Sequence, residues 1–438
     1  MSGTGKHRGF PPVALIFYSA RRNQYGLNVL AGALEPEEKE GVCSLFFSRN
    51  LEETLTLGRQ ALQKGQRVLV AWSFMTPEFP ARRTELHQFR AALRSDSLLH
   101  CCGGPHPSAL PETMLQAGWD LAAVGEGEQL LRTLVRRLAH DASIEDLPGL
   151  AWRVDDRIHR NLRGPEIVLD DYPPFAPRHR RFNPIEITRG CIYACKFCQT
   201  PFLFRARFRH RSVDRIVEAV REMQKAGLHD IRFITPSALS YGTDGPEPAL
   251  DRVEELLDAV RRTLGPQGRV FFGSFPSEVR PEHITPASLR LLKKYVNNDN
   301  LIIGAQTGSD RLLQISGRGH TVEQARAAVR YTLEAGFQAN VDLIFGMPGE
   351  TEEDRRQTLQ FALELVEMGA RIHAHTFLPL PGTPWARKPP GCIPVEWQRL
   401  FGRLSAAGKL YGSWKQQAEL AQWIATYIAD DRAQKSPD

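Results

Sequence analysis

Short apolar runs recur along the first third of the chain and constrain its fold more than any other feature. They cover residues 13–18, 42–47, 67–72, 98–102 and 121–124. Continuous apolar runs of this length are typical of strands that are buried on both faces of a parallel sheet. Helical stretches lie between them, and strands that alternate with helices predict an α/β fold with a doubly wound, Rossmann-like sheet. We place this domain at residues 12–140.

Small and polar residues follow these runs, at the edge where ligands bind in doubly wound sheets. The residues that we single out are Ser19, Ser73, Phe74, Gly103, Gly104, Pro105, His106, Gly125, Glu126 and Gly127. Glycine lets the backbone approach a ligand closely. Turn glycines of any α/β domain would give the same pattern, so these loops by themselves leave both interpretations open.

A second series of apolar runs predicts strand–helix units over residues 181–385. The expected strands are residues 185–188, 230–235, 269–274, 301–305, 340–345 and 372–377. In barrels built from such units, chemistry takes place at the carboxyl ends of the strands. Residues 141–180 are rich in turn residues and predict a linker with a small hairpin. Residues 386–438 predict a helical extension whose aromatic side chains pack against the barrel.

Three cysteines lie on the loop that follows the first strand of the second series. Three residues separate Cys191 from Cys195, and two separate Cys195 from Cys198. Three thiolates on one tight loop can hold three irons of a [4Fe–4S] cube and leave the fourth iron open to a substrate or cofactor. The alternative is a zinc knuckle or buried thiols, but zinc usually takes four ligands, and no fourth Cys or His is close in the sequence. The spacing therefore favours a reactive iron–sulfur cluster.

This stretch, with Phe197 just before the last cysteine, resembles the radical S-adenosylmethionine (SAM) enzymes. The loops at residues 103–107 and 125–128 resemble the N-terminal domain of their cobalamin-binding branch. The resemblance implies a partial (βα)₆ radical SAM barrel, SAM on the open iron, cobalamin on the N-terminal domain and an electron donor such as flavodoxin or ferredoxin. Many cobalamin proteins ligate cobalt through an Asp-x-His-x-x-Gly motif. The chain lacks that motif, so cobalamin is implied by the resemblance alone.

The resemblance also implies SAM contacts on the loops that follow the barrel strands. These are Phe197, Ser274, Ser277, Glu278, Arg280, Gln306 and Met347. A hydroxyl, amide or carboxylate among them could hold the ribose, and Arg280 could bind the SAM carboxylate. Each could equally belong to a structural turn or an ion pair, because a motif is a hypothesis until its context is known. No residue is identified that acts directly on a substrate.

The activity that the resemblance implies is a cobalamin-dependent radical SAM C-methyltransferase acting on an unactivated carbon. A radical derived from SAM would take hydrogen from that carbon, and methylcobalamin would then supply the methyl group. The sequence does not specify the substrate, which we expect to be a peptide or protein residue or a natural-product intermediate. One alternative is an oxidoreductase or cyclase of the same family without methyl transfer. Another is an RNA methylthiotransferase, although Cys43, Cys101 and Cys102 do not resemble the extra cluster cysteines of those enzymes.

Composition limits the compartment and the partners. The seven cysteines show no disulfide framework, and no apolar run is long enough to span a bilayer, so we expect a cytoplasmic protein without a membrane partner. Part of the net charge of +6 comes from arginine clusters at residues 178–181 and 205–211. A solvated face explains them better than a phosphate contact does, and no nucleic-acid-binding module of the usual kinds is present in the sequence. We therefore expect no nucleic-acid partner.

Overall fold

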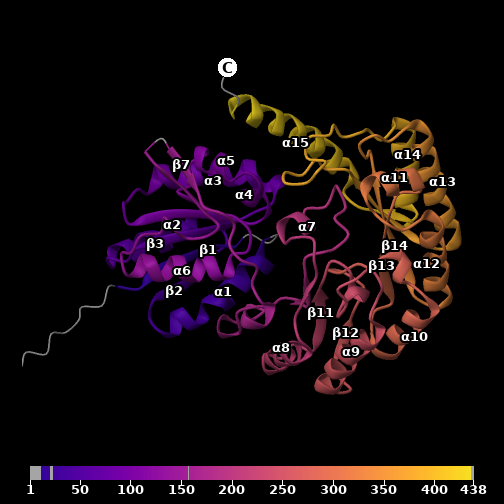
Figure 1. Ribbon diagram of the computed structural model, residues 1–438, viewed down its shortest axis with the longest axis horizontal. Helices are drawn as coiled ribbons and strands as arrows, with labels where there is room; N and C mark the ends of the chain where they lie inside the picture. Colours follow the sequence, from indigo (N-terminus) through magenta and orange to yellow (C-terminus); the bar gives the residue numbers. More distant parts are fainter. Residues whose placement is uncertain (1–10, 20–22, 156, 436–438) are drawn as a thin grey trace, which may run out of the picture. The chain divides into compact units, whose positions relative to one another are not determined.

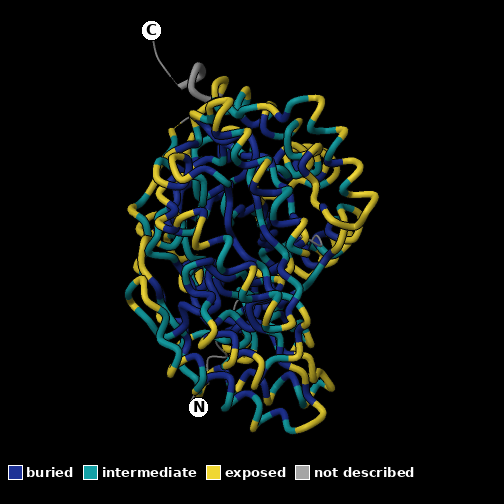
Figure 2. The backbone as a smooth tube through the Cα atoms, turned by 90° about the vertical axis from the view of Figure 1, so that its right-hand side faces the viewer, coloured by how far each residue is buried: buried dark blue, intermediate teal, exposed yellow. Residues whose placement is uncertain are grey.

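The chain divides into two compact units. The computed structural model describes residues 11–19, 23–155 and 157–435, and the division falls between Asn183 and Pro184. Figure 1 traces the elements of each unit along the chain. Buried segments gather in the interior of the units and exposed segments on their outer helices and loops, as Figure 2 shows.

The first unit is built on one seven-stranded sheet. Its strands are β1 (Val13–Tyr18), β2 (Cys43–Ser48), β3 (Val68–Ser73), β4 (Leu98–Gly103), β5 (Leu121–Ala123), β6 (Leu150–Val154) and β7 (Arg157–Arg160). The described helices are α1 (Gln24–Lys39), α2 (Leu51–Gln63), α3 (Phe79–Ala92), α4 (Pro105–Ala109), α5 (Pro111–Gln116) and α6 (Glu128–Ala139). The strand order is β2-β1-β3-β4-β5-β6-β7, and β1 to β5 pair in parallel. The predicted doubly wound sheet is therefore confirmed.

Helices cover both faces of this sheet. Helices α1 and α6 pack against each other and against β2, and α2 packs against β1 and α3 (Figure 1). All six residues of β1 are buried because the strand is central and covered on both sides. One face forms a core in which Leu15 and Phe17 of β1 meet Leu27 of α1 and Leu134 of α6. This burial explains the continuous apolar runs of the sequence.

Residues 141–183 pack as part of the first unit. The expected hairpin is β6–β7, which extends the sheet in antiparallel pairing. Gly32 of α1 has no side chain, and a Cβ there would collide with the carbonyl oxygen of Phe175. At the end of the segment, Asn183 Nδ2 donates to the carbonyl oxygen of Tyr25 at 2.9 Å. These contacts hold the segment against α1.

The second unit is a curved, mostly parallel sheet with helices outside it. Its strands are β8 (Ile185–Glu186), β9 (Thr188–Arg189), β10 (Arg209–His210), β11 (Asp230–Ile234), β12 (Arg269–Phe271), β13 (Asn300–Gln306), β14 (Gln338–Phe345), β15 (Arg371–Thr376) and β16 (Leu410–Tyr411). The described helices are α7 (Thr200–Leu203), α8 (Val213–Lys225), α9 (Leu250–Leu264), α10 (Pro286–Tyr295), α11 (Asp310–Ser316), α12 (Val322–Glu334), α13 (Glu352–Met368), α14 (Val395–Ala406) and α15 (Trp414–Lys435). Between the strands lie α8 to α13, as the alternation of the sequence predicts.

The sheet of the second unit has two parallel segments, β12-β11-β8 and β13-β14-β15-β16. They meet where Ile302 N donates to the carbonyl oxygen of Gly273 at 2.9 Å and where Val279 bridges to Ile303. The six predicted strands therefore form one partial barrel. The C-terminal extension is helical, as expected, but it also contributes the short strand β16, which pairs with β15. Two residues are too few for a periodic pattern, so this strand was not predicted from the sequence.

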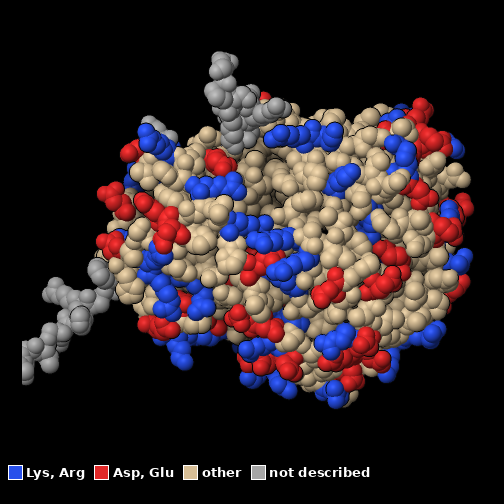
Figure 3. Space-filling model, viewed as in Figure 1, with Lys and Arg blue, Asp and Glu red and all other residues tan. Residues whose placement is uncertain are grey.

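Charge is spread over the surface of the chain. Figure 3 shows Lys and Arg interspersed with Asp and Glu on the visible face. Many exposed charges pair within one helix, as Arg215 does with Glu218 at 2.7 Å. In the cluster at residues 205–211, Arg211 is buried and donates from Nε to the carbonyl oxygen of Glu186 at 3.0 Å. Among the described residues, no helix is both long enough and apolar enough to cross a membrane.

Candidate functional site

The cysteine loop begins at the end of β9 and depends on a glycine. Gly190 has φ +81°, and a Cβ there would collide with the carbonyl oxygen of Arg207. Only glycine combines this left-handed conformation with so close an approach of two backbone segments. Further along, Lys196 N donates to the carbonyl oxygen of Ser316 at 2.9 Å, which fixes the loop to the end of α11. The sequence thus forces a tight turn directly before the first cysteine.

Cys191, Cys195 and Cys198 line one cavity of about 320 Å³ within the second unit. Cys195 is buried, and the other two are partly exposed. Burial raises the pKa of Cys191 to about 11 and also raises that of Cys198. Thiols must lose their protons to bind a metal, so metal binding here would release protons. Three converging thiols fit the three-cysteine ligand set of an iron–sulfur cluster.

A buried arginine lies beside the thiols. Arg318 Nη1 is 3.8 Å from Cys195 Sγ, and Arg318 Nη2 donates to the carbonyl oxygen of Gly304 at 2.6 Å. Glu278 lies 3.8 Å from the same guanidinium, and burial raises the pKa of that carboxyl. A buried cation offsets the negative charge of thiolates in a low-dielectric site. No motif in the sequence had indicated Arg318.

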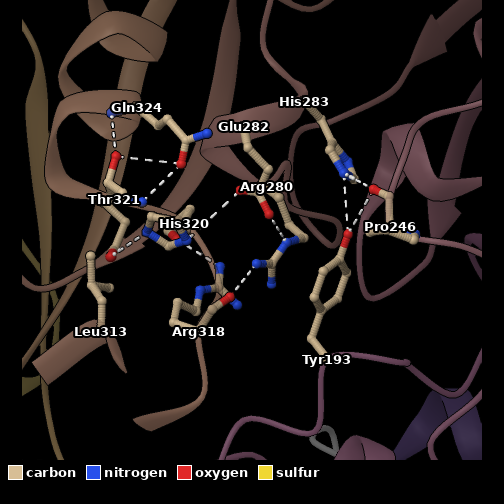
Figure 4. A network of polar contacts seen from close by, with 12 residues as sticks. Tyr193, Pro246, Arg280, Glu282, His283, Leu313, Arg318, His320, Thr321 and Gln324 are labelled. Atoms are coloured by element: carbon tan, nitrogen blue, oxygen red, sulfur yellow. Dashed lines mark hydrogen bonds and ion pairs between the residues drawn. The ribbon is translucent and has the colours of Figure 1, made fainter. Parts of the chain in front are cut away.

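A polar network anchors Tyr193, which lies inside the cysteine loop (Figure 4). The Tyr193 hydroxyl donates to the carbonyl oxygen of Pro246 at 3.1 Å and lies 3.2 Å from His283 Nε2. The Arg280 guanidinium stacks over the Tyr193 ring at 3.4 Å. Arg280 also donates from Nε to Glu282 at 2.5 Å and from Nη2 to the carbonyl oxygen of Arg318. The network thereby connects the cysteine loop to the segments that follow β12 and α11.

The residues predicted to contact SAM separate into two groups. Those that line the cavity with the cysteines are Phe197, Glu278, Arg280 and Gln306. Those that do not line it are Ser274, Ser277 and Met347. Ser277 Oγ instead donates to the carbonyl oxygen of Phe233 at 2.6 Å, and Met347 packs with Phe377 and Trp385.

Gln306 occupies a strained position at the end of β13. It is buried and has φ +72°, which is uncommon for a residue other than glycine. The pairing of β13 with β14 shifts register between Ile303 and Gln306. Strained backbone of this kind often occurs at functional sites. The fold thus holds Gln306 at the cavity in a strained backbone conformation.

Several polar residues of the cavity were not predicted from the sequence. They are Thr200, Ser237, Arg318, Asp342, His375 and Gln417. Asp342 and His375 alternate with buried residues along β14 and β15. Polar residues at every second position of a barrel strand face the lumen, and that pattern is the signal that could have revealed them.

The predicted cobalamin contacts of the first unit lie at or just after the carboxyl ends of β1, β3, β4 and β5. Several of their side chains are buried and bonded within the unit. Ser19 Oγ accepts from Arg181 Nη2 at 2.7 Å, and His106 is fully buried with Nδ1 3.1 Å from Thr76 Oγ1. Phe74 is buried among Phe79, His106 and Trp119.

The glycines of these loops serve packing inside the first unit. Gly104 has φ +95°, and a Cβ there would lie 3.0 Å from Ser73 Oγ and 3.2 Å from the backbone of Phe74. A Cβ on Gly127 would lie 2.9 Å from a side-chain carbon of Leu30. Glu126 Oε2 accepts from Ile167 N at 3.0 Å. Of the other predicted residues, Gly103 ends β4, Pro105 begins α4, and Gly125 lies in the loop after β5 with φ +94°.

Comparison with known proteins agrees with this architecture. The model of the Radical SAM superfamily matches residues 185–362. An uncharacterized protein of Methanopyrus kandleri is 25% identical over 396 residues, which are 77% of this chain and 71% of that protein. A tRNA-2-methylthio-N(6)-dimethylallyladenosine synthase of Prosthecochloris aestuarii is 30% identical over 237 residues, 52% of this chain and 51% of that protein. The chain thus spans about half the length of the curated methylthiotransferases that it matches.

Two solved structures share the fold over most of the chain. The radical SAM methyltransferase TsrM from Kitasatospora setae, with cobalamin and a [4Fe–4S] cluster bound, superposes with a TM-score of 0.67 at 18% identity. That match covers 86% of this chain and 74% of TsrM. The cobalamin-dependent radical SAM enzyme OxsB superposes with a TM-score of 0.63 at 16% identity, covering 81% of this chain and 52% of OxsB. Residues 185–362 therefore match the Radical SAM superfamily, and the chain shares its fold, over most of its length, with TsrM and OxsB.

Proposed function

We propose that the chain is a cobalamin-dependent radical SAM C-methyltransferase that acts on an unactivated carbon. The observation that carries this proposal is the convergence of Cys191, Cys195 and Cys198 on one polar cavity, in the unit that matches the radical SAM model. When bound, the cluster with SAM supplies the radical that opens a C–H bond, and cobalamin supplies the methyl group. The substrate class remains a peptide or protein residue or a natural-product intermediate.

The residues around the cavity suit these roles. The three thiolates would hold three irons, and the cation of Arg318 beside Cys195 would stabilise their negative charge. Glu278 and Gln306 supply a carboxylate and an amide at the same cavity, where they could hold the hydroxyls of a ribose. Arg280 offers a guanidinium to the SAM carboxylate, already oriented by Glu282 and Tyr193. Orientation of this kind is the main contribution of the protein to cofactor chemistry.

Cobalamin is proposed for the carboxyl edge of the sheet in the first unit. The support is the doubly wound sheet, which binds ligands at that edge, and the likeness of fold to TsrM and OxsB. His106 offers no accessible imidazole, since it is fully buried and contacts Thr76. We therefore expect cobalamin to bind without a histidine ligand from His106.

Methylthiolation is the second candidate, because methylthiotransferases of tRNA and of ribosomal protein uS12 are among the relatives. The three cysteines of the first unit argue against a second cluster there. Cys43 lies on β2, whereas Cys101 and Cys102 lie on β4, and β1 and β3 separate the two strands. Burial raises the pKa of Cys43 and of Cys101 to about 12, as expected of thiols inside an apolar core. A radical SAM oxidoreductase or cyclase without methyl transfer would differ only in the product.

The proposal is tested by anaerobic purification with cobalamin supplied, followed by reconstitution with iron and sulfide. We expect about four irons per chain, tightly bound cobalt and reductive cleavage of SAM with flavodoxin or ferredoxin as electron donor. A reducing compartment such as the cytoplasm suits this labile cluster. With SAM carrying a deuterated methyl group, a methyl gain in the product supports methyl transfer. Iron and SAM cleavage without cobalt would overturn the methyl-transfer mechanism and leave the radical SAM assignment intact.

A further inference from the structure

Asp342, His373 and His375 form a compact cluster on the inner face of the barrel. Asp342 pairs with His373 across β14 and β15, and His375 follows two residues later on the same face of β15. Asp342 Oδ1 lies 2.8 Å from His373 Nδ1 and 3.9 Å from His375 Nε2, and the two nitrogens lie 3.1 Å apart. The fold thus directs three potential metal-ligand atoms toward one point.

Hydrogen bonds alone do not satisfy this cluster. Gln417 Oε1 accepts from Thr376 N at 2.9 Å, so the amide nitrogen of Gln417 faces His375 Nδ1 at 3.3 Å. That contact needs a lone pair on Nδ1 and therefore a proton on Nε2 of a neutral His375. The Nε2–H then points at His373 Nδ1, which must accept it. A lone pair on His373 Nδ1 would, however, face the Asp342 carboxylate at 2.8 Å.

Placing the proton on His373 Nδ1 removes the unfavourable contact with Asp342 but creates another at Gln417. A proton on His373 Nδ1 satisfies Asp342 and can be shared with a lone pair on His375 Nε2. The remaining proton of His375 is then on Nδ1, where it meets the N–H groups of Gln417. With Asp342 ionised, as an aspartate is at neutral pH, every pair of neutral imidazoles leaves one unfavourable contact. Hydrogen bonds therefore leave one contact of the cluster unfavourable, and the short separations of the three ligand atoms suit a shared cation.

We propose that Asp342 Oδ1, His373 Nδ1 and His375 Nε2 are the ligands of one divalent transition-metal ion. Ligands about 2.1 Å from a metal, at tetrahedral to octahedral angles, lie about 3.0–3.4 Å from one another. The observed separations of 2.8, 3.1 and 3.9 Å bracket that range. Two imidazoles and one carboxylate are a ligand set that Zn²⁺ and Fe²⁺ accept.

The surroundings complete such a site. Tyr411 stacks on the His373 ring, with centroids 4.5 Å apart and planes 7° apart, and so fixes its orientation. A metal on His375 Nε2 leaves the proton of that ring on Nδ1, so the Gln417 amide would turn its oxygen toward it and give up the hydrogen bond from Thr376 N. An acceptor at this position is the outer-shell contact that metal-bound histidines usually make. Asp342 and His375 line the cysteine cavity, so the open coordination positions face the space where a substrate would lie. The ion would hold an oxygen or nitrogen donor of that substrate.

The test must separate this site from the cysteines, because thiolates also bind such metals. The full chain carrying Cys191→Ser, Cys195→Ser and Cys198→Ser is freed of metal with a chelator and titrated with Co²⁺. We expect one tightly bound Co²⁺, with ligand-field absorption and no sulfur-to-cobalt charge transfer, that Zn²⁺ displaces. Asp342→Asn, His373→Ala and His375→Ala in that background should each weaken binding by more than about 100-fold. Circular dichroism establishes that each variant is folded.

His159→Ala is the matched control, since His159 also lies on a strand and stacks on an aromatic ring, that of Trp152. It should leave the Co²⁺ affinity unchanged. A second measurement uses the reconstituted wild-type enzyme, whose thiols are occupied, and counts bound zinc with and without His375→Ala. One zinc per chain that this change removes supports the site. The metal site is refuted if the cysteine-free chain binds no Co²⁺ or only several weakly held ions, or if the ligand variants bind Co²⁺ as tightly as their parent. Neither measurement depends on SAM cleavage or methyl transfer.

Discussion

The two units show what distinguishes a sheet edge from a reactive site. Both are built on mostly parallel sheets with small and polar residues after the strands. In the second unit, thiols, carboxylates and guanidinium groups from separate loops and strands line one cavity. In the first, some of the predicted side chains lie inside the unit: His106 is fully buried, and Ser19 accepts a hydrogen bond from Arg181. A polar residue after a strand becomes part of a site only when neighbouring loops leave its polar atoms unpaired and accessible.

Two carboxylates, one buried and one half-buried, show the same contrast. In the first unit Glu37 is fully buried, but Arg132 and Arg136 lie 2.8 and 3.1 Å from its carboxylate. In the second unit Glu278 lies at the cavity with a single guanidinium 3.8 Å away. A paired buried charge is structural, whereas a weakly paired one at a cavity remains available to a ligand. The predictions below test this contrast.

The largest effect is expected from the cysteines. Changing any of Cys191, Cys195 and Cys198 to Ala should abolish SAM cleavage and leave the iron content near background, because three thiolates are needed to hold the cluster. Iron analysis and 5′-deoxyadenosine formation measure the two losses. Cys392→Ala is the control, since Cys392 is exposed and does not line the cavity. SAM cleavage that survived the triple change would refute the assignment of the second unit.

Phe74→Ala tests the claim that Phe74 of the first unit stabilises the fold and does not contact cobalamin. Phe74 is 1% exposed and packs against Phe79, His106 and Trp119, so its loss should cost about 3–5 kcal/mol of unfolding free energy. Denaturant titration measures this cost. Cobalamin affinity of the protein that remains folded should change little. A lost affinity with little loss of stability would instead make Phe74 a ligand contact.

Gly190→Ala and Gly227→Ala form a pair that separates a collision from backbone strain. Their φ angles are +81° and +82°, but a Cβ collides with Arg207 only at Gly190 and has no atom within 4 Å at Gly227. We expect Gly190→Ala to cost about 2–4 kcal/mol and to reduce iron binding. Gly227→Ala should cost only about 1 kcal/mol and leave iron binding unchanged. Equal effects would mean that the cysteine loop adapts to the collision.

The sequence predicted the features that local patterns determine. Apolar runs located every long strand, and the spacing of Cys191, Cys195 and Cys198 located the thiols, because both signals lie within a few residues. Arg318 and Gln417 were not predicted because they join the cavity only after distant segments pack together. The two-residue strand β16 was not predicted because its pairing with β15 is set by tertiary packing.

The smallest expected effect is a dependence of the unfolding free energy on pH. Glu350 ends the turn after β14, and burial raises its pKa to about 7, against the opposing influence of Arg355 and of the Gly346 N–H. A carboxyl whose pKa is higher in the folded state contributes stability that is complete below its unfolded pKa of about 4.5 and is lost as the pH rises to about 7. Above pH 7 the buried charge is a constant cost, unlike that of Glu37, which two arginines compensate.

Glu350→Gln keeps the shape of the protonated side chain and removes this cost. We therefore expect the variant to match the wild type near pH 4.5 and to exceed it by about 2 kcal/mol at pH 8, less than the full linkage value because Glu350 is partly exposed. Urea titrations at the two pH values measure the difference. Glu367→Gln, on the exposed face of α13, is the control. A gain of the same size at both pH values would show that ionisation of the Glu350 carboxyl does not cause it, and the contrast between paired and unpaired carboxylates would then rest on Glu278 alone.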